Sequence, residues 1–126
     1  NRFPNNPILL NNIALAYLSI KQINKAAELA SRAYDLLPQS VTVLDTKAWI
    51  EIARKNYQQA LSLLRMAYTL EHNNAEVNYH LAIVLDHLDR RDEAFSYLQA
   101  ASLMKKDFPE KQAAILLLNR WENSEI

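Results

Sequence analysis

Alanines recur along this chain at one fixed interval. Ala26, Ala60 and Ala94 follow one another at steps of 34 residues. Two further series keep the same step, and they consist of Ala14, Ala48 and Ala82, and of Ala33, Ala67 and Ala101. A period of about 20 to 50 residues is typical of stacked units that cannot bury their apolar faces alone. The chain is therefore expected to form an elongated array, and such arrays usually bind partners over concave surfaces.

The period divides most of the chain into three units, which cover residues 7–40, 41–74 and 75–108. Each unit contains two consecutive stretches in which apolar residues recur at helical spacing, so two helices are predicted per unit. Antiparallel helices approach closely only where their side chains are short. We therefore expect Ala14 and Ala26 to lie where the two helices of the first unit cross, with the matching alanines in the other units.

Capping residues agree with these units. Asn6 followed by Pro7 is typical of the start of a helix, because asparagine caps the first amides and proline fits the first turn. Ser40 is expected to cap the first helix of the second unit in the same way. Asn56 with Gln59 resembles a capping box at the start of the second helix of that unit.

The spaced residues resemble the pattern of the tetratricopeptide repeat family. The matches are Leu10, Ile13, Ala14, Tyr17, Ala26, Ala33 and Pro38, then Leu44, Ala48, Ala60, Leu64 and Ala67, then Leu81, Ala82, Ala94, Leu98 and Ala101. The resemblance implies an all-α fold, a right-handed α-solenoid of helix-turn-helix units. A C-terminal capping helix is expected within residues 109–126, over about 110–122. Residues 1–6 are expected to be the end of a preceding repeat, so that the chain would be a fragment of a longer array.

The chain also departs from the family pattern. The family often has glycine in the turn inside each unit, whereas this chain contains no glycine and has Lys21, Lys55 and Asp89 there. If these residues keep the left-handed conformation, each costs on the order of 1 kcal/mol. Glu51 stands where tyrosine is usual, and Asn78 replaces a bulky apolar residue.

Composition disfavours several classes of function. Lys and Arg together number 14, as do Asp and Glu, so there is no basic excess for a nucleic-acid partner. The absence of cysteine excludes a disulfide framework and thiolate metal ligands. No apolar run approaches the ~20 residues of a membrane span, so no direct membrane insertion is expected. Without glycine-flanked serines or a deep acidic cleft, we expect no catalytic residue, no cofactor and no enzyme activity.

In the resembled family, the first helices of the units line a concave groove. The positions that would face it hold Asn11, Asn12, Leu15, Asp45, Thr46, Trp49, Ile52, Tyr79, His80, Ile83, Asp86 and His87. The resemblance implies a protein or peptide partner at this groove. Trp49 and Tyr79 are residue types typical of interface anchors, and asparagine amides can bond an extended backbone. The alternative is that Trp49 and Tyr79 pack against neighbouring helices.

Two narrower types of site are disfavoured. Chaperone-binding members of the family hold an acidic tail with Lys, Arg and Asn, whereas the matching positions here hold Asn11, Leu15, Thr46, Glu76 and His80. We therefore predict no clamp for such a tail, because none of these positions holds a lysine or arginine and because Glu76 would repel the acidic tail. His80 and His87 lie about 10 Å apart along a helix, which is too far for one metal ion. No metal site is expected.

The last predicted helix is apolar almost all round, although a terminal cap should have a polar outer side. Leu118 and Trp121 could therefore form a self-association surface and give a homo-oligomer. Two alternatives are contact with a unit outside this chain, and folding of both side chains over the last position of the groove.

A narrower resemblance concerns two stretches, residues 44–68 and 77–94. They are similar to repeats of bacterial lipoproteins linked to exopolysaccharide export and protein sorting, which would imply a periplasmic or membrane-anchored location. Otherwise a cytoplasmic location is expected. The main functional interpretation is a scaffold or adaptor that binds a partner segment in the groove. The alternatives are a structural assembly module of a bacterial export or secretion system, and a regulatory repeat domain of an enzyme.

Overall fold

The computed structural model describes residues 5–124, and these residues form helices without any strand. The helices are α1 (Pro7–Ser19), α2 (Ile23–Leu36), α3 (Val41–Ala53), α4 (Tyr57–Leu70), α5 (Ala75–His87), α6 (Arg91–Leu103) and α7 (Lys111–Ser124). The expected all-α solenoid is confirmed. Residues 1–4 of the predicted preceding repeat lie outside the described residues.

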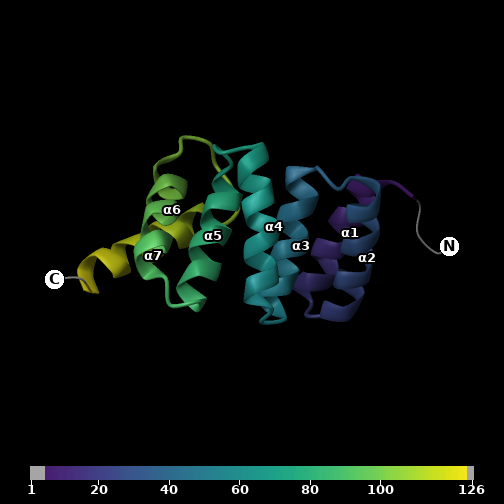
Figure 1. Ribbon diagram of the computed structural model, residues 1–126, viewed down its shortest axis with the longest axis horizontal. Coiled ribbons are helices and arrows are strands. Elements are labelled where there is room, and N and C mark those ends of the chain that lie inside the picture. Colours follow the sequence, from purple (N-terminus) through teal and green to yellow (C-terminus); the bar gives the residue numbers. More distant parts are fainter. Residues whose placement is uncertain (1–4, 125–126) are drawn as a thin grey trace.

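The helix pairs α1–α2, α3–α4 and α5–α6 follow one another along the long axis of the molecule, and the two ends of the chain lie at opposite ends of the stack (Figure 1). The most extensive contacts join α1 with α2, α3 with α4, and α5 with α6. The first helices also contact one another, since α3 packs against both α1 and α5. One side of the solenoid is therefore built from α1, α3 and α5.

The alanines of the 34-residue period lie in the core, as expected for short side chains between packed helices. All nine alanines of the three series are 0% exposed. Large side chains such as Leu44, Leu64 and Leu98 fill the space beside them and are also fully buried. Short side chains let the helix backbones approach, and the neighbouring leucines then fill the grooves between them.

The turns inside the three units share one backbone geometry. Lys21, Lys55 and Asp89 have φ values of 63°, 65° and 59°, so the left-handed conformation usually given to glycine is retained. The amide after each of these residues donates to a carbonyl five residues earlier, as from Gln22 to Tyr17 at 2.9 Å. This bond closes a Schellman motif and satisfies carbonyls at the end of each first helix.

Side-chain capping follows the sequence at two predicted helix starts and differs at a third. Asn6 accepts hydrogen bonds from the amides of Ile8 and Leu9, and Ser40 accepts one from Val43. These two caps confirm the prediction.

The predicted capping box at Asn56 and Gln59 is wrong. The Asn56 side chain makes no capping bond and instead donates to the buried carboxylate of Glu51 at 2.8 Å. Arg54 donates to the other oxygen of Glu51 at 3.4 Å. Glu51 thus occupies the usual tyrosine position because its carboxylate binds the turn of its own unit.

Asn78 has a comparable role between units. Its buried amide donates to the carbonyl of His72 at 2.9 Å and to that of Asn74 at 2.8 Å. The polar residue at this apolar position therefore fixes the connection between α4 and α5.

The last helix packs on the end of the array. Trp121 is only 3% exposed, and the guanidinium carbon of Arg91 lies 4.2 Å from its ring centroid. Leu118 is half-buried against the core, while Leu116 is 55% exposed. The expectation that Trp121 offers surface to a second copy is corrected, because its ring is covered within the chain. Among the described helices, none combines the length and apolar character needed to cross a membrane.

Candidate functional site

A cavity of about 230 Å³ opens on the side built from the first helices. Its lining residues come from α1, α3, α5 with its N-cap, and the connection before α7, and they are Leu15, Thr42, Asp45, Thr46, Trp49, Asn74, Glu76, His80, Pro109 and Glu110. We call this cavity and its lining the groove site. Residues from four separate segments meet here because the stacked units bring their first helices side by side.

Some of the predicted groove residues meet at this site. Leu15, Asp45, Trp49 and His80 line the cavity together with Thr46. Leu15 is 39% exposed and Trp49 is half-buried, so both offer apolar surface to the cavity.

The other predicted groove residues lie elsewhere. Asn12 is exposed and Ile83 is half-buried, but neither lines the cavity. Asp86 accepts a hydrogen bond from Arg91 at 2.6 Å, and His87 stacks on Tyr57 with ring centroids 4.4 Å apart. Asp86 and His87 are therefore occupied by neighbours near the far end of α5.

Burial corrects the expectation for three further residues. Tyr79 is 8% exposed and packs against Phe108, with 6.3 Å between ring centroids, because the connection before α7 covers it. Asn11 is 3% exposed, so its amide is not presented to an extended backbone. Ile52 is also buried in the core.

His80 forms the buried centre of the groove site. Its Nδ1 lies 2.6 Å from Oδ1 of Asp45, and its Nε2 lies 2.8 Å from Oε2 of Glu110. An ionised carboxylate only accepts hydrogen bonds, so two such partners require both ring nitrogens to donate. His80 is therefore held as an imidazolium ion that joins α3, α5 and the connection before α7.

The surroundings of His80 decide its protonation. Burial alone would lower the pKa of His80, but the charge and hydrogen bond of Asp45 and those of Glu110 outweigh it and raise the pKa to about 9. The ring of Trp49 stacks on His80 with centroids 4.1 Å apart and 20° between their planes. Trp49 is thus fixed in place by a cationic ring.

Glu76 and Glu110 were not among the residues expected to line the groove. Glu110 lies 30 residues from His80 in sequence, so helical spacing could not place them together. Glu76 was considered only as a residue that would repel an acidic tail, although its place in the first turn of α5 puts it at the cavity. Both carboxylates join Asp45 around the single imidazolium ion.

The charges around the cavity do not balance. Burial raises the pKa of Glu76, and the negative charges of Asp45 and Glu110 raise it further. His80 and Lys106 act in the opposite direction but do not cancel these effects. With all three carboxylates ionised, the groove site carries a net charge of about −2 in a chain whose formal net charge is zero.

Comparison with known proteins now identifies the family. A family model described as tetratricopeptide repeat matches residues 51–118. The chain belongs to the tetratricopeptide repeat family. Its similarity to the BBSome complex member BBS4 of Xenopus tropicalis reaches 33% identity over 119 residues, covering 93% of this chain. The chain spans only 23% of the length of that relative.

Solved structures show the same fold. The first tetratricopeptide domain of Spaghetti (RPAP3), bound to the HSP90 peptide SRMEEVD, matches with a TM-score of 0.79 at 14% identity. That match covers 94% of this chain and 91% of the other. The type III secretion translocator chaperone SycD of Yersinia enterocolitica matches with a TM-score of 0.77 at 15% identity, over 90% and 88% of the two chains. The narrower resemblance to exopolysaccharide-export lipoproteins is not confirmed by these comparisons.

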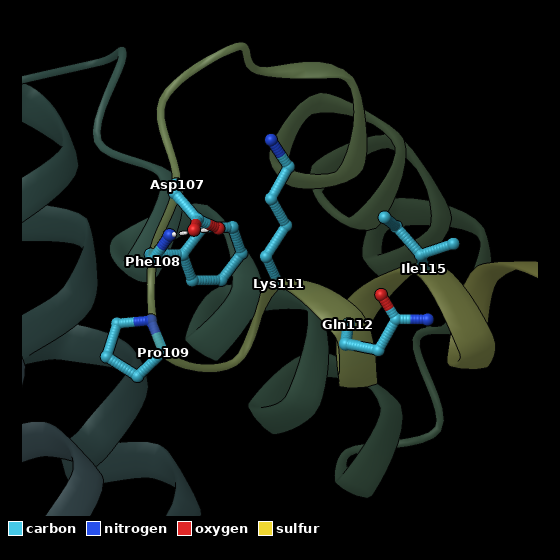
Figure 2. Close-up of a pocket in the computed structure, with 6 residues that line it drawn as sticks. All are labelled: Asp107, Phe108, Pro109, Lys111, Gln112 and Ile115. Atoms are coloured by element: carbon cyan, nitrogen blue, oxygen red, sulfur yellow. Dashed lines mark hydrogen bonds between the residues drawn. The ribbon is translucent and has the colours of Figure 1, made fainter.

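A second, more open depression lies beside the start of α7 in this repeat domain. Figure 2 shows its lining residues, which are Asp107, Phe108, Pro109, Lys111, Gln112 and Ile115. Two of its polar side chains, those of Asp107 and Lys111, form hydrogen bonds with nearby backbone groups. The Asp107 carboxylate accepts a bond from the Phe108 amide at 3.1 Å, and Lys111 Nζ donates to the carbonyl of Lys105 at 3.4 Å. These bonds organise the connection that carries Glu110 to His80.

Within residues 5–124, His, Asp and Glu side chains do not form a group that could hold a metal ion. Proteins of this family generally act as scaffolds, and their domains generally mediate protein–protein interactions. The groove site is the candidate surface for such an interaction.

Proposed function

We propose that this chain binds an extended segment of a partner protein in the groove formed by α1, α3 and α5. The observation that carries the proposal is the groove site, where Leu15 and the ring of Trp49 line a cavity open to solvent. Tryptophan held at the centre of a concave surface is a typical interface anchor. His80 holds Trp49 in position before any partner arrives, which lowers the entropy lost on binding.

The relatives support an interaction role. One similar structure is a domain bound to a peptide, another is a chaperone, and the curated relative is a member of a complex. We therefore place this chain as an adaptor or scaffold module, without catalysis, within a larger assembly.

The groove site is not expected to hold an acidic chaperone tail. The clamp positions contain Leu15, Thr46 and Glu76, and the cation at the site, His80, is already paired with two carboxylates. Glu76 would repel an incoming carboxylate.

Self-association is a second candidate function, and exposed apolar residues favour it. Leu103 is 79% exposed and Leu116 is 55% exposed at the C-terminal end of the array. On this proposal the chain assembles with itself or with neighbouring domains, as in an export system or an attached enzyme, and the groove residues are dispensable.

Partner capture with matched variants tests the first proposal. Thr42 is exposed at the cavity, so Thr42→Arg should block the groove without disturbing the core. Thr69 is exposed on α4, and Thr69→Arg serves as the matched control. We expect cross-linking mass spectrometry to identify a partner that the parent chain and Thr69→Arg capture and that Thr42→Arg loses. Equal capture by all three would refute groove binding.

A further inference from the structure

Within residues 5–124, the lining of the groove cavity contains three carboxylates and one cation, the His80 imidazolium. His80 is paired with Asp45 at 2.6 Å and with Glu110 at 2.8 Å. The single positive charge of the imidazolium faces two carboxylates, so His80, Asp45 and Glu110 together keep one negative charge. Glu76 adds a second.

Glu76 is the third of these carboxylates and lies in the first turn of α5. In residues 5–124, its side chain makes neither a hydrogen bond nor an ion pair, although it is half-buried at the cavity wall. Lys106 lines a neighbouring depression together with Glu76 and lowers the Glu76 pKa, but no ion pair joins them. A half-buried charge without a partner is unfavourable, and a bound cation would stabilise it.

The cavity is the size of a side chain. Its volume of about 230 Å³ is below the roughly 300 Å³ at which small-molecule pockets begin. Leu15, Trp49 and Pro109 supply apolar surface beside the carboxylates. Lysine and arginine have this dual character, since their aliphatic stems pack on apolar surface while the charged end remains polar.

From this charge complementarity we infer that the groove site receives a lysine or arginine side chain of the partner, with Glu76 as its main ion-pair acceptor. The inference rests on the proposed function and adds the chemistry of the partner. The stem of the basic side chain lies along Trp49 and Leu15, and its charged end reaches Glu76. An acidic segment is excluded from the same place by like charge.

Selection from a random peptide library on the immobilised chain tests this inference. Peptides that bind the parent chain but not the Thr42→Arg variant are classed as groove binders. We expect the groove binders to be enriched in Lys and Arg. Affinities of selected peptides are then measured by fluorescence anisotropy. Glu76→Gln should weaken them about tenfold, as expected for a charge-assisted hydrogen bond. Glu28→Gln, at an exposed site on α2, is the matched control and should change affinity less than about twofold.

A double-mutant cycle assigns the pairing. Replacing the selected Lys or Arg of the peptide with Gln should cost affinity in the parent chain and little in Glu76→Gln. Circular dichroism confirms that the variants are folded. Groove binders without basic enrichment, or with equal affinity for Glu76→Gln, overturn this inference alone. If no selected peptide depends on the groove, both this inference and the proposed function fail.

Discussion

The His80 ring joins α3, α5 and the connection before α7 through its two carboxylate partners, Asp45 and Glu110. The resemblance to the tetratricopeptide repeat family implied that His80, Asp45 and Trp49 face the groove. Their mutual contacts were not predicted, because pairing across units depends on how adjacent helices stack. Glu110 was missed for the same reason, since a connecting segment carries it back to α5.

The raised pKa of His80 predicts a pH dependence of folding. An unfolded histidine titrates near 6.5, whereas His80 in the folded chain titrates at about 9. The stabilisation from this proton is therefore complete below about pH 6.5 and is lost as the pH rises through 9. We expect the free energy of unfolding to fall by roughly 2–3 kcal/mol between about pH 6 and pH 9.5, measured by urea denaturation.

The variant His80→Gln separates this effect from other titrating groups. It should be less stable than the parent chain at pH 6, because two carboxylates lose their cation. It should also lose most of the decline in stability above pH 6.5. An equally steep decline in the variant would contradict the assignment of the proton to His80.

Lys55 predicts a stabilising substitution. Its φ of 65° is left-handed, a conformation in which the Cβ atom lies too close to the following carbonyl oxygen. Glycine has no Cβ and avoids this clash. We expect Lys55→Gly to raise the free energy of unfolding by about 0.5–1 kcal/mol in chemical denaturation. Lys55→Ala keeps the Cβ and should show no comparable gain. If both variants have the same stability, backbone strain at this turn is ruled out.

At the scale of elements, the apolar pattern of the last helix had several interpretations. Its existence was predicted over 110–122, and α7 extends over Lys111–Ser124. Whether Trp121 faced solvent, another chain or its own array could not be read from periodicity, because nearly every side of the helix is apolar. Burial of Trp121 beside Arg91 shows that α7 packs on its own array.

The packing of Trp121 predicts a local loss of stability in α7. Trp121→Ala removes a ring that is 3% exposed and should lower the free energy of unfolding by about 3 kcal/mol. Hydrogen exchange should quicken in α7 first, since terminal units of repeat arrays depend only on their neighbours. Leu116→Ala, at an exposed site, should change stability by less than about 0.5 kcal/mol. Similar losses in both variants would mean that Trp121 does not anchor the helix.

At the scale of the whole molecule, the repeat was sufficient to predict an all-α solenoid, because nine alanines in register allow few other arrangements. The groove site was predicted only in part. Leu15, Asp45, Trp49 and His80 meet as expected, while Tyr79 is covered by the segment before α7. Phe108 is the last position of the third unit, and Pro109 and Glu110 follow it, so the alanine spacing inside the units does not show how this segment folds back over α5.

Binding of a partner segment in the groove is the central claim, and the two tryptophans of the chain allow a direct test. Trp49 lines the cavity, whereas Trp121 belongs to α7 and is buried against the array. The measurement is a nitrogen–proton correlation spectrum of the labelled chain during titration with a selected peptide. We predict that the indole signal of Trp49 shifts with saturation while that of Trp121 stays in place. If the indole signal of Trp121 shifts while that of Trp49 stays unchanged, the claim is contradicted and binding occurs at the last helix.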